Sequence, residues 1–154
     1  MELTADLGAR TCLIPSFGTA TATWEQAKRL LSGVAETAAR RGVVAGVEGS
    51  IWWRAGLGDE ETFLRMVEEV DSPGLGVYAH PQSAGRANAD EIRMLGRHLV
   101  CLHHFAMSPE RVDYPAMLAA LKDVGYDYAW VFEVTAEELP GSKRVLDGLL
   151  AEHW

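Results

Sequence analysis

Ionisable side chains end four successive apolar runs of this sequence. Glu48 ends "VVAGVE", His80 ends "LGVYAH", His104 or its neighbour His103 ends "LVCLHHF", and Glu133 closes "YAWVFE". Parallel α/β folds gather ligands at the carboxyl ends of their strands, so these side chains would converge on one spot. Two imidazoles and two carboxylates suit one divalent transition metal: manganese, zinc, iron or cobalt. A shared cation would also offset the cost of burying charged carboxylates.

Each of these residues also has an ordinary alternative role, as a solvated loop residue or a helix-cap partner. The pair His103 and His104 raises a further question of orientation. Successive side chains of a strand point to opposite faces, so at most one of the two shares a face with Leu102. The residue pattern by itself leaves open which histidine that is.

The apolar runs alternate with segments of helical spacing. Strands are predicted at 11–17, 43–48, 75–80, 99–105 and 128–134. Helices are predicted between and after them, with start signals at Thr23, Asp59, Asn88, Asp113 and Ser142. Strands that read as apolar throughout and alternate with helices indicate a parallel α/β sheet. No linker interrupts the pattern, so we expect one α/β domain over 1–154.

Composition limits the classes of partner. The chain has 154 residues and a formal net charge of −8, which argues against nucleic-acid binding because that function needs a basic face. No apolar run approaches the length that spans a membrane, and the opening "MELTADLGAR" does not resemble a secretory leader. Cys12 and Cys101 lie far apart without metal-type spacing, which favours free thiols in a reducing cytoplasm.

Aromatic residues cluster near the predicted strand ends. They are Trp52, Trp53, Tyr78 and Phe105. Tryptophans in such a loop either line a ligand pocket or pack in the interior. Arg54 and Arg86 follow the second and third strands and are candidates to meet an anionic group there, although surface arginines are the commoner case.

Four segments in this order carry a family resemblance: "GVVAGVEG", "VEEVDSPGLGVYAH", "HLVCLHHF" and "ALKDVGYDYAWVFEV". Together they resemble the xylose isomerase-like TIM-barrel superfamily, the sugar phosphate isomerase and epimerase group. The resemblance covers nearly the whole chain but matches only the C-terminal part of a family barrel. It therefore implies parallel (βα) repeats in an incomplete or shortened TIM barrel of about five strands, since a complete barrel takes about 250 residues.

The resemblance also implies roles for individual residues. The metal ligands would be Glu48, His80, His104 and Glu133, with His80 at a position where the family usually has Asp. Glu48 and Glu133 would move the proton beside a carbonyl. Ser83 stands where a substrate-holding histidine is common, and Arg111 is the nearest candidate to bind a substrate oxygen. On this alignment His104 faces the barrel interior with Leu102, and His103 faces the helices.

The expected function is a metal-dependent isomerase or epimerase, or a related lyase, acting on a small carbonyl or hydroxy compound. Two alternatives stay open, a non-catalytic shortened barrel that binds a ligand or partner, and a metal-dependent hydrolase. Exposed edges at 11–17 and 128–134 favour a homodimer, because unpaired strand edges invite association. The second copy would cover an inner face with Val44, Tyr78, Leu102 and Val131, and Trp52 and Trp53 are candidates for that contact.

Overall fold

The computed structural model describes residues 1–14, 23–48, 60–80 and 88–154, and five strands lie within these ranges. They form one parallel sheet in chain order: β1 (Thr11–Ile14), β2 (Val44–Glu48), β3 (Leu75–Ala79), β4 (Leu99–His104) and β5 (Trp130–Phe132). Each lies within a strand predicted from the sequence. The parallel (βα) architecture of a shortened TIM barrel is thus confirmed, and predicted strand residues 15–17 lie outside the described ranges.

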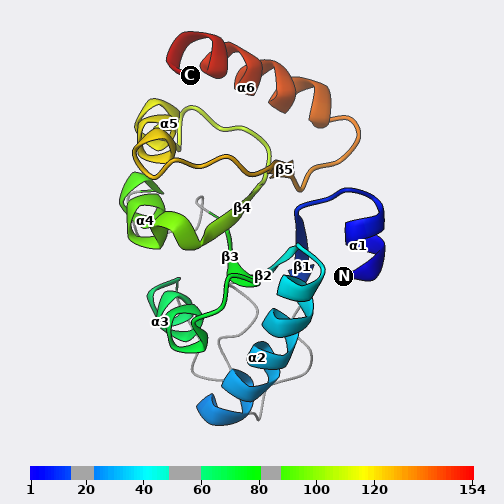
Figure 1. Ribbon diagram of the computed structural model, residues 1–154. Coiled ribbons are helices and arrows are strands. Elements are labelled where there is room, and N and C mark those ends of the chain that lie inside the picture. Colours follow the sequence, from blue (N-terminus) through cyan, green and yellow to red (C-terminus); the bar gives the residue numbers. More distant parts are fainter. Residues whose placement is uncertain (15–22, 49–59, 81–87) are drawn as a thin grey trace.

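The helices from residue 24 onward follow one another around the outer side of the curled sheet, and the short N-terminal helix lies beside β1 (Figure 1). They are α1 (Glu2–Asp6), α2 (Trp24–Arg40), α3 (Glu60–Val70), α4 (Asn88–Leu95), the 3₁₀ turn η3 (Gly96–His98), α5 (Tyr114–Asp123) and α6 (Leu139–His153). Two differences from the prediction stand out. The short α1 was not expected, and α6 begins at Leu139, before the predicted Ser142, because Pro140 is accommodated in its first turn. No helix in the described part of the chain is long and apolar enough to cross a membrane.

Helix boundaries follow the capping signals in the sequence. Thr23 and Gln26 make a reciprocal capping box at the start of α2, as predicted. The Asp113 carboxylate accepts the backbone N–H of Ala116, 3.0 Å away, at the start of α5. Gly42 follows α2 with φ +67°, a left-handed conformation that glycine adopts without steric cost. These signals fix where each helix turns back toward the sheet.

The main hydrophobic core lies between the helices and the outer face of the sheet. Buried residues of the strands and helices share it, among them Val47, Val77, Leu102, Phe63 and Met117. Burial of such side chains stabilises by roughly 25 cal/mol per Å² of apolar surface. The helices therefore hold the strands from outside, and the inner face of the sheet is left for Glu48 and the residues near it.

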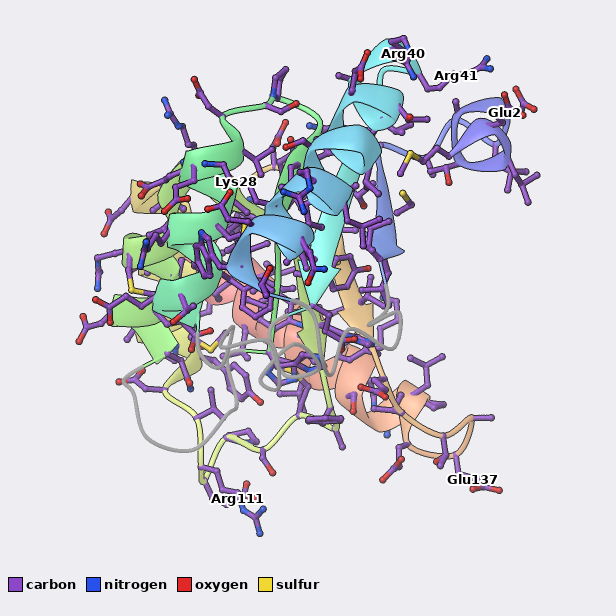
Figure 2. All side chains as sticks on the ribbon, turned by 90° about the horizontal axis from the view of Figure 1, so that it is seen from below. Glu2, Lys28, Arg40, Arg41, Arg111 and Glu137 are labelled. Carbon is purple, nitrogen blue, oxygen red and sulfur yellow. The ribbon has the colours of Figure 1, made fainter. Side chains whose placement is uncertain are left out.

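The sheet curls far enough for its two edge strands to be bridged at their amino-terminal ends. Arg10 lies just before β1, and Asp127 lies just before β5. The Arg10 guanidinium donates hydrogen bonds to the Asp127 carboxylate at 3.1 Å and to the Asp127 backbone carbonyl at 3.0 Å. The same guanidinium lies 4.5 Å from the ring centroid of Tyr128. On the other side of β1, Arg41 forms an ion pair with Glu2 of α1 (Figure 2). The N-terminal segment is thus fastened to both the start of β5 and the end of α2.

Candidate metal centre and active site

The site is built around Glu48, the last residue of β2. Glu48 is only 7% exposed, and its carboxylate accepts a hydrogen bond from Nε2 of His80, which follows β3. His80 is itself buried. A carboxylate removed from water is costly unless it is paired, and the neighbouring strand supplies the partner. The structure therefore brings these two predicted site residues into contact.

His103 joins this pair from β4 and connects it to β5. Its Nδ1 lies 3.4 Å from Glu48 Oε1, and its Nε2 lies 3.6 Å from Glu133 Oε2. The ring centroids of His103 and His80 are 4.6 Å apart. His103 therefore stands between the two carboxylates, one facing each of its ring nitrogens.

The predicted orientation of the histidine pair is wrong. His104 is fully buried against Tyr114 of α5 and Trp130 of β5, with ring centroids 5.5 and 5.2 Å away. Leu102, expected on the inner face, belongs to the helix-side core. The structure thus places His103, and not His104, beside Glu48.

A β-bulge explains the reversal. The register between β3 and β4 shifts after Val77, which pairs with Leu99, so that Tyr78 pairs with Cys101. Val100 is the extra residue, and its side chain lies against the inner-face positions Gly46 and Gly76. Alternation resumes one residue later and turns His103 inward. Burial lowers the pKa of His104, so that its imidazole is neutral, and its Nδ1 bonds to the Phe105 carbonyl at 2.8 Å.

Some of the other predicted site residues lie at this cluster, and others do not. Glu133 contacts His103, but its side chain is 53% exposed. Phe105 stacks on His80 with centroids 5.5 Å apart, and Tyr78 is buried beside His103. Arg111 is not brought to the cluster. Its side chain is 81% exposed and projects outward, away from the rest of the protein (Figure 2). The predicted residues Trp52, Trp53 and Ser83, together with Arg54 and Arg86, lie outside the described residues.

The arrangement fits a divalent cation. Glu48, His80 and His103 each offer one ligand atom, and these atoms all lie within 4.8 Å of one another. One carboxylate and two imidazoles are a donor set that zinc, iron and cobalt accept. His103 was the member that the sequence prediction missed. Strand alternation had narrowed the choice to two adjacent histidines, and the bulge decided between them.

The chain matches the model of the xylose isomerase-like TIM barrel family over residues 1–151. It belongs to that family. No curated protein matches the sequence.

Solved structures share its fold at low sequence identity. A D-tagatose 3-epimerase-like protein aligns with a TM-score of 0.73 at 17% identity, over 96% of this chain and 64% of that one. An L-ribulose 3-epimerase aligns with a TM-score of 0.65 at 20% identity, over 97% and 55%. A D-allulose 3-epimerase from Methylomonas sp., in complex with D-allulose, aligns with a TM-score of 0.65 at 17% identity, over 94% of this chain and 58% of that one. The chain thus spans between 55% and 64% of the length of these structures.

Proposed function

We propose that this protein is a metal-dependent isomerase or epimerase that moves a proton beside the carbonyl group of a small hydroxy-carbonyl compound. Membership of the xylose isomerase-like family supports the class of reaction. The observation that carries the proposal is the placement of Glu48 and Glu133 at opposite nitrogens of His103. An epimerisation needs two acid–base groups that reach one substrate, and both carboxylates lie next to a residue proposed to hold the cation.

In this proposal Glu48, His80 and His103 hold the cation, with Glu133 as a fourth candidate ligand. The donor set suits manganese, zinc, iron or cobalt. When bound, such a cation polarises a carbonyl oxygen and stabilises the negative charge of an enediolate.

The two glutamates perform the proton transfers. One carboxylate removes the proton from the carbon next to the carbonyl, and the C–H electron pair moves to form the enediolate. The other glutamate, protonated, returns a proton to the opposite face of the same carbon, which inverts its configuration. Glu48 is buried and paired with His80, whereas Glu133 is half exposed, so Glu133 exchanges its proton with solvent more readily.

The substrate is proposed to be a ketose or a compound of similar size. The similar structures are an L-ribulose 3-epimerase, a D-allulose 3-epimerase with D-allulose bound, and a D-tagatose 3-epimerase-like protein. Phe105 offers an apolar wall next to His80 and favours a flatter or more apolar substrate than a bare sugar phosphate. Substrate contacts by Trp52, Trp53 and Ser83 remain part of this proposal, since those residues flank the strand ends in sequence.

The proposal is tested by metal content and by isotope exchange. Protein purified without chelator should carry close to one equivalent of a transition metal, and less than a tenth of an equivalent would overturn metal dependence. In D₂O, a panel of ketoses should incorporate deuterium beside the carbonyl, followed by ¹H NMR. Glu133→Gln should abolish that incorporation, whereas Glu137→Gln, on the same exposed segment, should leave it unchanged. Metal binding without exchange would favour the hydrolase, and absence of both would favour a non-catalytic binding protein.

We also propose a homodimer in the cytoplasm. The outer edges of β1 and β5 carry no neighbouring strand in the described part of the chain, and Leu3, Leu7 and Leu13 near β1 are exposed. Cys12 and Cys101 are free thiols, in keeping with a reducing compartment. Light scattering coupled to gel filtration should give twice the 16.8 kDa monomer mass, and a monomer at micromolar concentration would overturn the dimer.

A further inference from the structure

We propose that Tyr78 is a positioning residue, which holds the His103 ring between Glu48 and Glu133 from beneath. The inference rests on the ligand set proposed above and deepens it. It explains why a buried tyrosine occupies the middle of the inner face, where the sequence predicted a residue that touches substrate. It also assigns a role to Gly46, which lies two residues before Glu48 on the same face of β2.

Tyr78 occupies the centre of the inner face. In the parallel register it is paired with Glu48 of β2 on one side and Cys101 of β4 on the other. Its side chain is turned across β2: a Cβ built on Gly46 would lie 2.5 Å from Tyr78 Cδ2 and 3.4 Å from Tyr78 Cε2. The ring therefore fills the space that a side chain at position 46 would need. Only 8% of Tyr78 is exposed, which leaves little surface for substrate.

The tyrosine side chain is buried inside the sheet, beside β4. Cys101 of β4 is the register partner of Tyr78, and its sulfur lies 3.4 Å from the Ala129 carbonyl in the segment before β5. The ring is therefore packed over Gly46, within the inner face of the sheet.

The fixed ring supports the imidazole above it. Tyr78 and His103 meet edge to face, with centroids 5.7 Å apart and planes at 87°. Such aromatic pairs stabilise each other beyond the effect of the apolar area they bury. Because the Tyr78 ring occupies the adjacent space on the inner face, the His103 imidazole cannot rotate into that space. Its two nitrogens therefore stay directed at Glu48 and Glu133.

Three substitutions separate this role from a general packing role. Tyr78→Phe keeps the ring and removes the hydroxyl. Tyr78→Leu removes the edge-to-face support. Gly46→Ala adds a methyl group that pushes the ring out of place, whereas Gly33→Ala is the matched control, because nothing lies within 4 Å of a Cβ built on Gly33. Thermal unfolding of each variant establishes that it is folded at the temperature of measurement.

Two readouts test the role. Co²⁺ titrations, followed through the visible absorption of the bound ion, should give an affinity about tenfold lower for Tyr78→Leu and Gly46→Ala, as for other residues that orient metal ligands. Tyr78→Phe and Gly33→Ala should stay within about twofold of the unaltered protein. In the metal-free protein, the ¹H–¹³C signals of the His103 ring, assigned with His103→Gln, should shift in Tyr78→Leu because the tyrosine ring current is lost.

The outcomes distinguish the two proposals. If the unaltered protein binds no Co²⁺ or other transition metal, the proposed function fails, and the His103 signals alone then decide whether Tyr78 positions the ring. If folded Tyr78→Leu binds Co²⁺ as tightly as the unaltered protein, or leaves the His103 signals in place, the positioning role is overturned while the metal centre stands.

Discussion

Glu48 Oε1 and His103 Nδ1 lie 3.4 Å apart, although β3 lies between the two strands that carry these residues. Neighbouring strands in a sheet are about 4.8 Å apart, so the two backbones stand about twice that distance from each other in a flat sheet. The side chains meet because the sheet is curled and both point to its concave side. His80 reaches the same point from the intervening strand. Curvature, rather than proximity in the chain, therefore assembles the candidate site.

The two adjacent histidines should respond differently to substitution. His103→Ala removes a proposed ligand and should reduce metal uptake below a tenth of an equivalent. His104→Ala leaves the cluster intact but opens a cavity against Tyr114 and Trp130, so it should lower the free energy of unfolding by about 2–4 kcal/mol. Elemental analysis and urea unfolding of both variants provide the measurement. Loss of metal in His104→Ala alone would contradict the orientation of β4.

His80 should influence which metal the site prefers. Together with His103 it makes the donor set rich in nitrogen, which favours zinc and cobalt over manganese more strongly than an oxygen-rich set does. His80→Asp exchanges one nitrogen donor for an oxygen donor and should reduce the ratio of zinc to manganese affinity by about tenfold. Competition titrations give the two affinities, with His153→Asp, near the end of α6, as the control. An unchanged ratio would mean that His80 is not a ligand.

The fold was largely predictable because its signals are local. Each strand is a short apolar run, and the Thr23 capping box and the Asp113 cap mark helix starts by hydrogen bonds that span only three residues. The choice of His103 over His104 was not predictable in that way. It depends on the bulge opposite Tyr78, and the extra residue fits only because Gly46 and Gly76 leave room for Val100 on the inner face. That condition depends on residues of three different strands, so no single short segment of the sequence predicts it.

Two glycines should show opposite effects on stability. Gly33 lies within α2 with open space around it, so Gly33→Ala should raise the free energy of unfolding by about 0.5–1 kcal/mol through helix propensity. A Cβ on Gly74 would lie 2.1 Å from the Ala35 carbonyl oxygen of the same helix. Gly74→Ala should therefore push α2 away from the turn before β3 and cost more than about 2 kcal/mol. Urea unfolding measures both, and a neutral Gly74→Ala would contradict this close approach.

Glu69 should make the stability of the protein depend on pH in the acid range. Its carboxylate accepts hydrogen bonds from Trp24 Nε1 at 3.0 Å, Lys28 Nζ at 3.1 Å and Arg65 Nε at 2.9 Å. The bond from Trp24, followed by that from Lys28, lowers the pKa of Glu69 from 4.5 to about 2. A carboxyl group whose pKa is lower in the folded state stabilises the fold above its unfolded pKa, and this contribution is lost as the pH falls toward the folded value.

The Glu69 contribution should therefore be complete above pH 4.5 and disappear as the pH falls toward about 2. Glu69→Gln removes the charge, so it should lower the urea midpoint at pH 7 and flatten its decline through that acid window. Glu68→Gln, one residue earlier on α3 and exposed, is the control and should retain the decline. Urea midpoints at pH 7, 5 and 3 for the three proteins give the comparison. An equal decline in Glu69→Gln and the unaltered protein would mean that the link between α2 and α3 does not depend on the charge of Glu69.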